Sequence, residues 1–170
     1  NKGNYLENDI TRPINYYGKC KLESENILIG SNRPYVIFRP NVLFDFFNSN
    51  FFTYVYNSLN NNKSINIVHD QISNPVFIPD FAKAILDSIL LDAEGTFHFG
   101  SLESLSRYDF AVQIAKSYNM NSSLINKVSS KSLNQIATRP FNTTLNCNKI
   151  VNNFDIELFP VSYYLKKNIL

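Results

Sequence analysis

A tyrosine and a lysine stand four positions apart, at Tyr17 and Lys21, in the stretch NYYGKCKLESENILIG. The good helix formers and the final glycine of this stretch predict a helix, so the two side chains share one helical face. An ammonium group close to a phenol favours the phenolate form, and such a tyrosine could exchange a proton with a carbonyl or hydroxyl group. The lysine could also hydrogen-bond the ribose of a cofactor.

The spacing alone is weak evidence for catalysis. Tyr163 and Lys167 show the same spacing near the C-terminus, and a chain with 10 tyrosines forms such pairs by chance. On spacing alone, an ordinary pair on an exposed helix is the simpler interpretation. Only the sequence that surrounds each pair can distinguish a catalytic pair from an ordinary one.

The surrounding elements are those of an α/β protein. Helices are expected over 15–30, 46–60, 79–91 and 106–118, with short ones near 146–152 and 160–168, and strands over 35–38, 65–69 and 95–100. The run YVIF between two prolines is typical of a buried parallel strand. Ser106 and Asp109 have the spacing of a helix-capping pair. Alternating helices and strands indicate right-handed crossovers in an α/β fold.

Composition and charge exclude several classes of protein. Of the 170 residues, 44% are hydrophobic and 18% charged, which suits one packed domain and not a disordered chain. No apolar run reaches the roughly 18 residues of a membrane helix, so we expect no membrane contact. The net charge of +2 comes from scattered residues, so we expect no nucleic-acid partner.

The cysteines and glycines limit the cofactor chemistry. Cys20 and Cys147 have no second Cys or His at ligand spacing, which predicts no metal site and a reducing, cytoplasmic compartment. No two of the five glycines are closer than five residues, so the chain has no glycine-rich phosphate loop. Its only methionine is Met120. We therefore expect a part of a longer protein, and no reductase activity from these 170 residues alone.

The context of Tyr17 resembles the extended short-chain dehydrogenase/reductase family, specifically its dTDP-4-dehydrorhamnose reductase branch. That branch typically reads Pro-x-Asn-x-Tyr-Gly-x-x-Lys-x-x-x-Glu, matched here by Pro13, Asn15, Tyr17, Gly18, Lys21 and Glu25. Further similar segments follow in order: VHDQISNP, FIPDFAKAI, GTFHFGSLESLSRYDFAVQIA and ATRPFNTTLNCNKI. The resemblance covers about residues 1–152 and leaves Tyr163 outside the pattern.

The resemblance implies a fold and a set of catalytic roles. It implies the C-terminal part of a Rossmann-like parallel sheet over residues 1–40 and a smaller α/β substrate-binding region over 41–170, in one continuous compact unit. Tyr17 would be the general acid that protonates a keto oxygen, and Lys21 would assist it. Tyr17, Lys21 and Arg39 would contact the cofactor, NADP or NAD.

The resemblance also implies the substrate class. Four polar residues are expected to face a nucleotide sugar: Asn41, Gln71, Asn74 and Arg139. An arginine is well suited to a diphosphate, although Arg139 could equally bind loop carbonyls. The implied function is part of an NAD(P)-dependent reductase of a nucleotide-linked 4-keto-6-deoxy sugar. The absence of tryptophan and Val76 in place of the family's threonine leave the sugar itself open.

Three alternatives remain. One is a non-catalytic binding subunit of the same fold, like the regulatory subunit of methionine adenosyltransferase. The second is a nucleotide-sugar epimerase or dehydratase, and the third is a truncated gene product that is inert alone. His69 and His98 are expected to be structural, the former beside Asp70 in a strand and the latter between two phenylalanines. The aromatic run from Phe44 to Tyr56 is expected to form core packing, or else to cover the interface of a homodimer.

Overall fold

The computed structural model describes residues 2–133, 135–154 and 156–167. The helices are α1 (Tyr16–Ile29), α2 (Phe51–Asn60), α3 (Ile78–Leu90), α4 (Arg107–Ser117), α5 (Asn148–Phe154) and α6 (Val161–Lys167). The strands are β1 (Val36–Pro40), β2 (Leu43–Phe44), β3 (Ile65–Val68), β4 (Ile72–Ser73), β5 (Val76–Phe77), β6 (Gly95–Phe99), β7 (Leu105–Ser106) and β8 (Ile125–Val128). Two short 3₁₀ turns, η1 (Ser122–Leu124) and η2 (Ser130–Ser132), flank β8.

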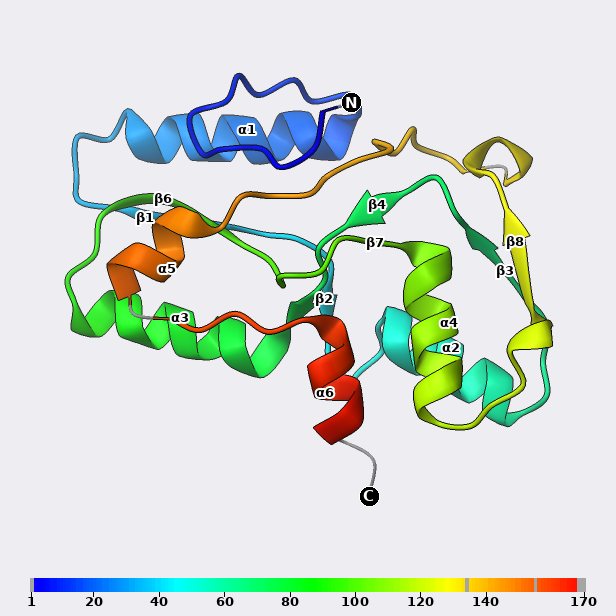
Figure 1. Ribbon diagram of the computed structural model, residues 1–170. Helices are drawn as coiled ribbons and strands as arrows, with labels where there is room; N and C mark the ends of the chain where they lie inside the picture. Colours follow the sequence, from blue (N-terminus) through cyan, green and yellow to red (C-terminus); the bar gives the residue numbers. More distant parts are fainter. Residues whose placement is uncertain (1, 134, 155, 168–170) are drawn as a thin grey trace.

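The described strands associate in pairs, most of them parallel. Strand β1 pairs with β6, β2 with β5 and β3 with β8 in parallel, whereas β4 and β7 are antiparallel. In Figure 1 the β1/β6 pair lies at one end of the molecule and the β3/β8 pair at the other. Parallel pairs joined through helices confirm the expected α/β class.

Strand β1 separates two helices because its side chains alternate between two faces. On one face, the Phe38 ring lies 5.6 Å from that of Phe81 in α3 and 6.1 Å from that of Phe97 in β6, between centroids. The next residue, Arg39, instead contacts Glu25 of α1. The alternation of β1 therefore places α1 and α3 on opposite faces of the strand.

Buried apolar side chains form two clusters. One, centred on Phe110 and Ile114 of α4, joins that helix to α2, β3 and α6. The other, centred on Phe97 and Ile150, joins β6 to α3 and α5. These two clusters fix the positions of the strand ends at which the predicted site residues stand.

Helix α2 is shorter than the sequence predicts. It was expected over 46–60 and begins only at Phe51. The buried carboxylate of Asp45 accepts two backbone N–H groups of the following turn, and Asn50 forms a capping box with Thr53. These polar contacts stabilise a loop before the helix, which apolar spacing does not reveal.

Strand β8 was not predicted. Its sequence, INKV, lies in a polar stretch, and a four-residue strand with one buried residue has a weak periodic signal. It forms by pairing with β3, where Ile65 stands opposite Ile125.

The expected division at residue 40, within one continuous compact unit, remains a prediction. Strands β1 and β6, which lie on either side of this boundary in the sequence, pair with each other. Within the described residues, no helix has the length and apolar character needed to cross a membrane.

Candidate active site

The start of α1 is fixed by local capping. The side chain of Asn15 accepts the Gly18 N–H at 2.8 Å and donates to the Thr138 carbonyl at 2.9 Å. The Cβ of Pro13 would lie only 3.1 Å from a Cβ added at Gly18. The Pro, Asn and Gly of the motif therefore build the first turn of the helix, and Tyr17 projects from that turn.

Tyr17 and Lys21 lie on one exposed face of α1, as their spacing predicts. The Lys21 Nζ is 5.8 Å from the centroid of the Tyr17 ring, and Tyr17 is 71% exposed. Within the described part of the chain, no side chain hydrogen-bonds either of them or pairs with the Lys21 charge. Both groups are therefore accessible to a ligand that approaches this end of the helix.

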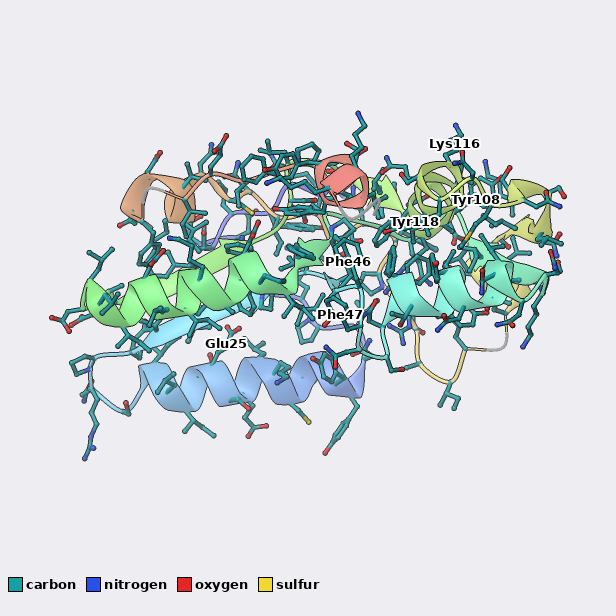
Figure 2. The ribbon with its side chains drawn as sticks, turned by 90° about the horizontal axis from the view of Figure 1, so that it is seen from below. Glu25, Phe46, Phe47, Tyr108, Lys116 and Tyr118 are labelled. Atoms are coloured by element: carbon teal, nitrogen blue, oxygen red, sulfur yellow. The ribbon has the colours of Figure 1, made fainter. Side chains whose placement is uncertain are left out.

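Arg39 holds α1 against β1. Its Nε lies 2.9 Å from Glu25 Oε1 and its Nη2 2.6 Å from Glu25 Oε2, while Nη1 donates to the Glu7 carbonyl at 3.2 Å. The hydrogen bond with Glu25 raises the pKa of Arg39. In Figure 2 Glu25 lies between α1 and the strand. The resemblance implies that Arg39 contacts the cofactor. In the structure, several of its N–H donors instead bind Glu25, on the helix that carries Tyr17.

His98 lies beside this ion pair, and its hydrogen bonds are to other groups of the protein. It is 2% exposed, with Nδ1 3.0 Å from the Tyr5 carbonyl oxygen and Nε2 3.5 Å from Arg39 Nη1. Its backbone N–H donates to the Glu7 carboxylate at 3.0 Å. Burial lowers the pKa of His98.

Asn41 and Asn74, two of the predicted substrate residues, contact each other. Asn41 Nδ2 donates to Asn74 Oδ1 at 2.8 Å and to the Thr143 carbonyl at 2.7 Å. Asn74 is 4% exposed and also binds the backbone of Leu145 and Ser101. Their amides connect the end of β1 to two loops, and Asn74 lines a cavity of about 780 Å³.

The cavity of about 780 Å³ beside Asn74 is a poor site for an anion. Among the described residues, its lining is made of amide, hydroxyl, thiol and apolar side chains with one acid, Glu157, and no Lys, Arg or His. Nor do three His, Cys, Asp or Glu side chains of the described residues gather as metal ligands would.

Gln71 and Arg139, the other two predicted substrate residues, meet at a second, smaller pocket of about 210 Å³. Gln71 Nε2 donates to Ser130 Oγ at 2.9 Å and to Gln135 Oε1 at 3.1 Å. The four predicted residues therefore fall into two groups, one at the end of β1 and one beside β3.

Arg107 and Phe51, which also line this smaller pocket, are among the residues that sequence reasoning missed. The guanidinium carbon of Arg107 lies 4.8 Å from the centroid of the Phe51 ring. Burial lowers the pKa of Arg107, and the positive charge of Arg139 lowers it further. One signal was available: Arg107 is the first residue of a helix, where the helix dipole disfavours a cation.

Comparison with known proteins identifies the family. The family described as "RmlD substrate binding domain" matches residues 1–169. The chain belongs to this family. It is 30% identical over 166 residues to the dTDP-4-dehydrorhamnose reductase of Aggregatibacter actinomycetemcomitans, covering 91% of this chain and 56% of that protein. It is also 30% identical over 155 residues to methionine adenosyltransferase 2 subunit beta of Bos taurus, covering 86% and 46%.

Solved structures show the same relationship. The dTDP-4-dehydrorhamnose reductase of Clostridium acetobutylicum has a TM-score of 0.88 and 30% identity, over 99% of this chain and 60% of that one. The enzyme of Bacillus anthracis, in complex with NADP, has a TM-score of 0.88 and 26% identity, over 96% and 58%. The resemblance inferred from the motifs and the Rossmann-like α/β fold of this RmlD-family chain are thereby confirmed. The chain spans about half the length of the curated relatives it matches.

Proposed function

We propose that this chain supplies the proton donor and the substrate side of an NAD(P)-dependent reductase that acts on a nucleotide-linked 4-keto-6-deoxy sugar. One observation carries the proposal: Tyr17 and Lys21 stand together, exposed and without a described partner, on one face of α1. They do so inside the motif shared with the reductase branch and in a chain related to dTDP-4-dehydrorhamnose reductases.

The residues at α1 suit a nicotinamide cofactor, since a phenol and an ammonium group lie side by side with no carboxylate paired to Lys21 among the described residues. NADP or NAD, when bound, supplies the hydride. The Tyr17 hydroxyl donates a proton to the keto oxygen of the sugar. The Lys21 ammonium stabilises the phenolate and hydrogen-bonds the nicotinamide ribose. Arg39 contributes to cofactor binding by holding α1, which carries Tyr17 and Lys21, through its ion pair with Glu25.

The substrate side is proposed to lie at the strand ends. Asn41 and Asn74 shape the loop at the end of β1 that faces the sugar. Gln71 and Arg139 line the smaller pocket, where a guanidinium suits the diphosphate of the nucleotide.

A cytoplasmic homodimer completes the proposal. Cys20 and Cys147 are both free thiols, in keeping with a reducing compartment. Most of the aromatic run from Phe44 to Tyr56 packs in the core, but Phe47, labelled in Figure 2, is 87% exposed and Tyr54 is 50% exposed. A second copy could cover these two rings.

A second candidate is a non-catalytic binding subunit. It is favoured by one observation, the 30% identity to methionine adenosyltransferase 2 subunit beta, which equals the identity to the reductase.

A thermal-shift screen of the intact natural protein tests the proposal. A specific ligand raises the apparent melting temperature, so NAD or NADP and one of a panel of keto-sugar nucleotides should each do so. Sugar nucleotides without a keto group serve as controls for binding of the nucleotide alone. Stabilisation by neither class of ligand would contradict the proposal, and stabilisation without NAD(P)H oxidation would favour the binding subunit.

A further inference from the structure

The smaller pocket is built from four separate segments of the chain. Phe51 begins α2, Gln71 follows β3, Arg107 begins α4, and Arg139 lies in the long segment after β8. The Arg107 N–H donates to the Gln71 carbonyl at 3.1 Å, which fixes the start of α4 against the loop after β3. The pocket thus brings two guanidinium groups together from positions 32 residues apart in the sequence.

The pocket has an uncompensated positive charge. Within the described part of the chain, its lining contains no Asp or Glu and neither arginine forms an ion pair. The neighbouring carboxylates are engaged elsewhere: Asp70 accepts the N–H and hydroxyl of Ser130, and Asp109 accepts the hydroxyl of Ser106. No protein anion among the described residues therefore neutralises Arg107 or Arg139.

Arg107 is held where the fold disfavours it. The helix dipole places partial positive charge at the start of α4, the neighbouring Arg139 repels a second cation, and burial removes hydration from the guanidinium. Contact with the Phe51 ring supplies part of the compensation through a cation–π interaction. A cation kept at a position that lowers stability is expected where a bound anion provides the missing charge.

We propose that Arg107, oriented by Phe51, is a second anion-binding residue, and that it and Arg139 together hold the diphosphate group of the nucleotide sugar. Each guanidinium offers a planar fork of N–H donors that matches two phosphate oxygens. A volume of about 210 Å³ suits a diphosphate rather than a whole nucleotide sugar, whose remaining parts extend out of the pocket. The identity of the ligand as a nucleotide sugar rests on the proposed function; the selectivity for a diphosphate follows from the two arginines.

Calorimetric binding to the intact protein tests this inference without any turnover. The probes are dTDP, dTMP and thymidine, with UDP as a second nucleoside diphosphate. Arg107→Gln should weaken dTDP binding about 10- to 100-fold, the loss expected for charge-assisted hydrogen bonds, and should leave thymidine binding unchanged. Arg107→Lys keeps the charge but loses the fork and should give an intermediate loss. Arg33→Gln, at an exposed arginine outside the pocket, is the matched control and should bind dTDP as the wild type does.

The outcomes separate this inference from the proposed function. Unchanged dTDP affinity in Arg107→Gln, or equal losses for dTDP and thymidine, would overturn it. So would a wild-type protein that binds neither nucleoside diphosphate. If Arg107→Gln loses dTDP selectively and the wild type reduces no keto sugar, the anion site stands and the proposed reductase function fails.

Discussion

The carboxylate of Glu25 in α1 is bound by two nitrogen atoms of Arg39 in β1, at 2.9 Å and 2.6 Å. Glu25 stands four residues after Lys21 and eight after Tyr17, so the three side chains follow one helical face. No residue of α1 is buried. The position of the proposed proton donor therefore depends on polar contacts of α1, above all this ion pair and the Asn15 cap.

Removal of Arg39 should destabilise the protein. Arg39→Gln leaves the Glu25 carboxylate, 18% exposed, without its cation. We expect a loss of about 1–3 kcal/mol in the free energy of unfolding, measured by urea titration. Lys83→Gln removes the i,i+4 ion pair with Asp87, in which the lysine side chain is 69% exposed, and should change that free energy by less than about 0.5 kcal/mol. Equal losses in the two variants would contradict this role of Arg39.

Asp45 should give stability that depends on pH. Burial would raise the pKa of Asp45, but hydrogen bonds from Asn48, Phe47 and Asn50 outweigh it and leave the pKa below its usual value. A lowered folded-state pKa stabilises the fold fully above the unfolded-state value, about 3.9, and this stabilisation disappears as pH falls through the folded-state value. Asp45→Asn should therefore be less stable than the wild type at pH 7, with a gap that narrows below about pH 4. A gap in unfolding free energy that stays constant from pH 7 down to about pH 2.5 would contradict it.

The two cysteines should differ sharply in reactivity. Burial raises the pKa of the Cys147 thiol to about 12, whereas Cys20 is exposed on α1. The thiolate is the reactive form, so iodoacetamide near neutral pH should label Cys20 and spare Cys147 in the native protein. Peptide mapping by mass spectrometry measures both sites, and urea-unfolded protein, in which both should react, is the control. Equal labelling of the native sites would show that Cys147 is not enclosed as described.

Gly100 should not tolerate a side chain. A Cβ at this position would lie 2.2 Å from Asn74 Nδ2, and the buried Asn74 amide is held by several hydrogen bonds. Gly100→Ala should lower the unfolding free energy by about 1–3 kcal/mol, the usual range for overpacking. Gly30→Ala, at the end of α1 with φ −73°, is the control and should have a smaller effect. Equal stability of Gly100→Ala and the wild type in a urea titration would show that the Asn74 loop can move.

Local geometry explains what the sequence could predict. Tyr17 and Lys21 share a face because a four-residue spacing on a helix always does so, and β1 was recognisable from its apolar run between prolines. The proximity of Arg107 to Arg139 was not predictable, since it arises from the pairing of β8 with β3 and the contact of α4 with the Gln71 loop. No local pattern encodes such tertiary proximity.

The two asparagines near the end of β1 also make contacts that their sequence positions do not reveal. The sequence predicts that Asn41 and Asn74 face a substrate, and the structure shows that they bind each other and the backbone. Sequence position showed that they stand near strand ends, but it could not show how much of their hydrogen-bonding capacity the protein itself uses. Their contact with a substrate stays a prediction.

The most direct test of the central claim is the rate of NAD(P)H oxidation by the intact protein with a nucleotide-linked 4-keto-6-deoxy sugar. Tyr17→Phe should lower kcat at least about a hundredfold through loss of the positioned acid, while cofactor binding persists. Tyr163→Phe, which alters the other Tyr-x-x-x-Lys pair, should leave the rate unchanged. An unchanged rate in Tyr17→Phe would contradict the account, because Tyr17 would then not be the proton donor.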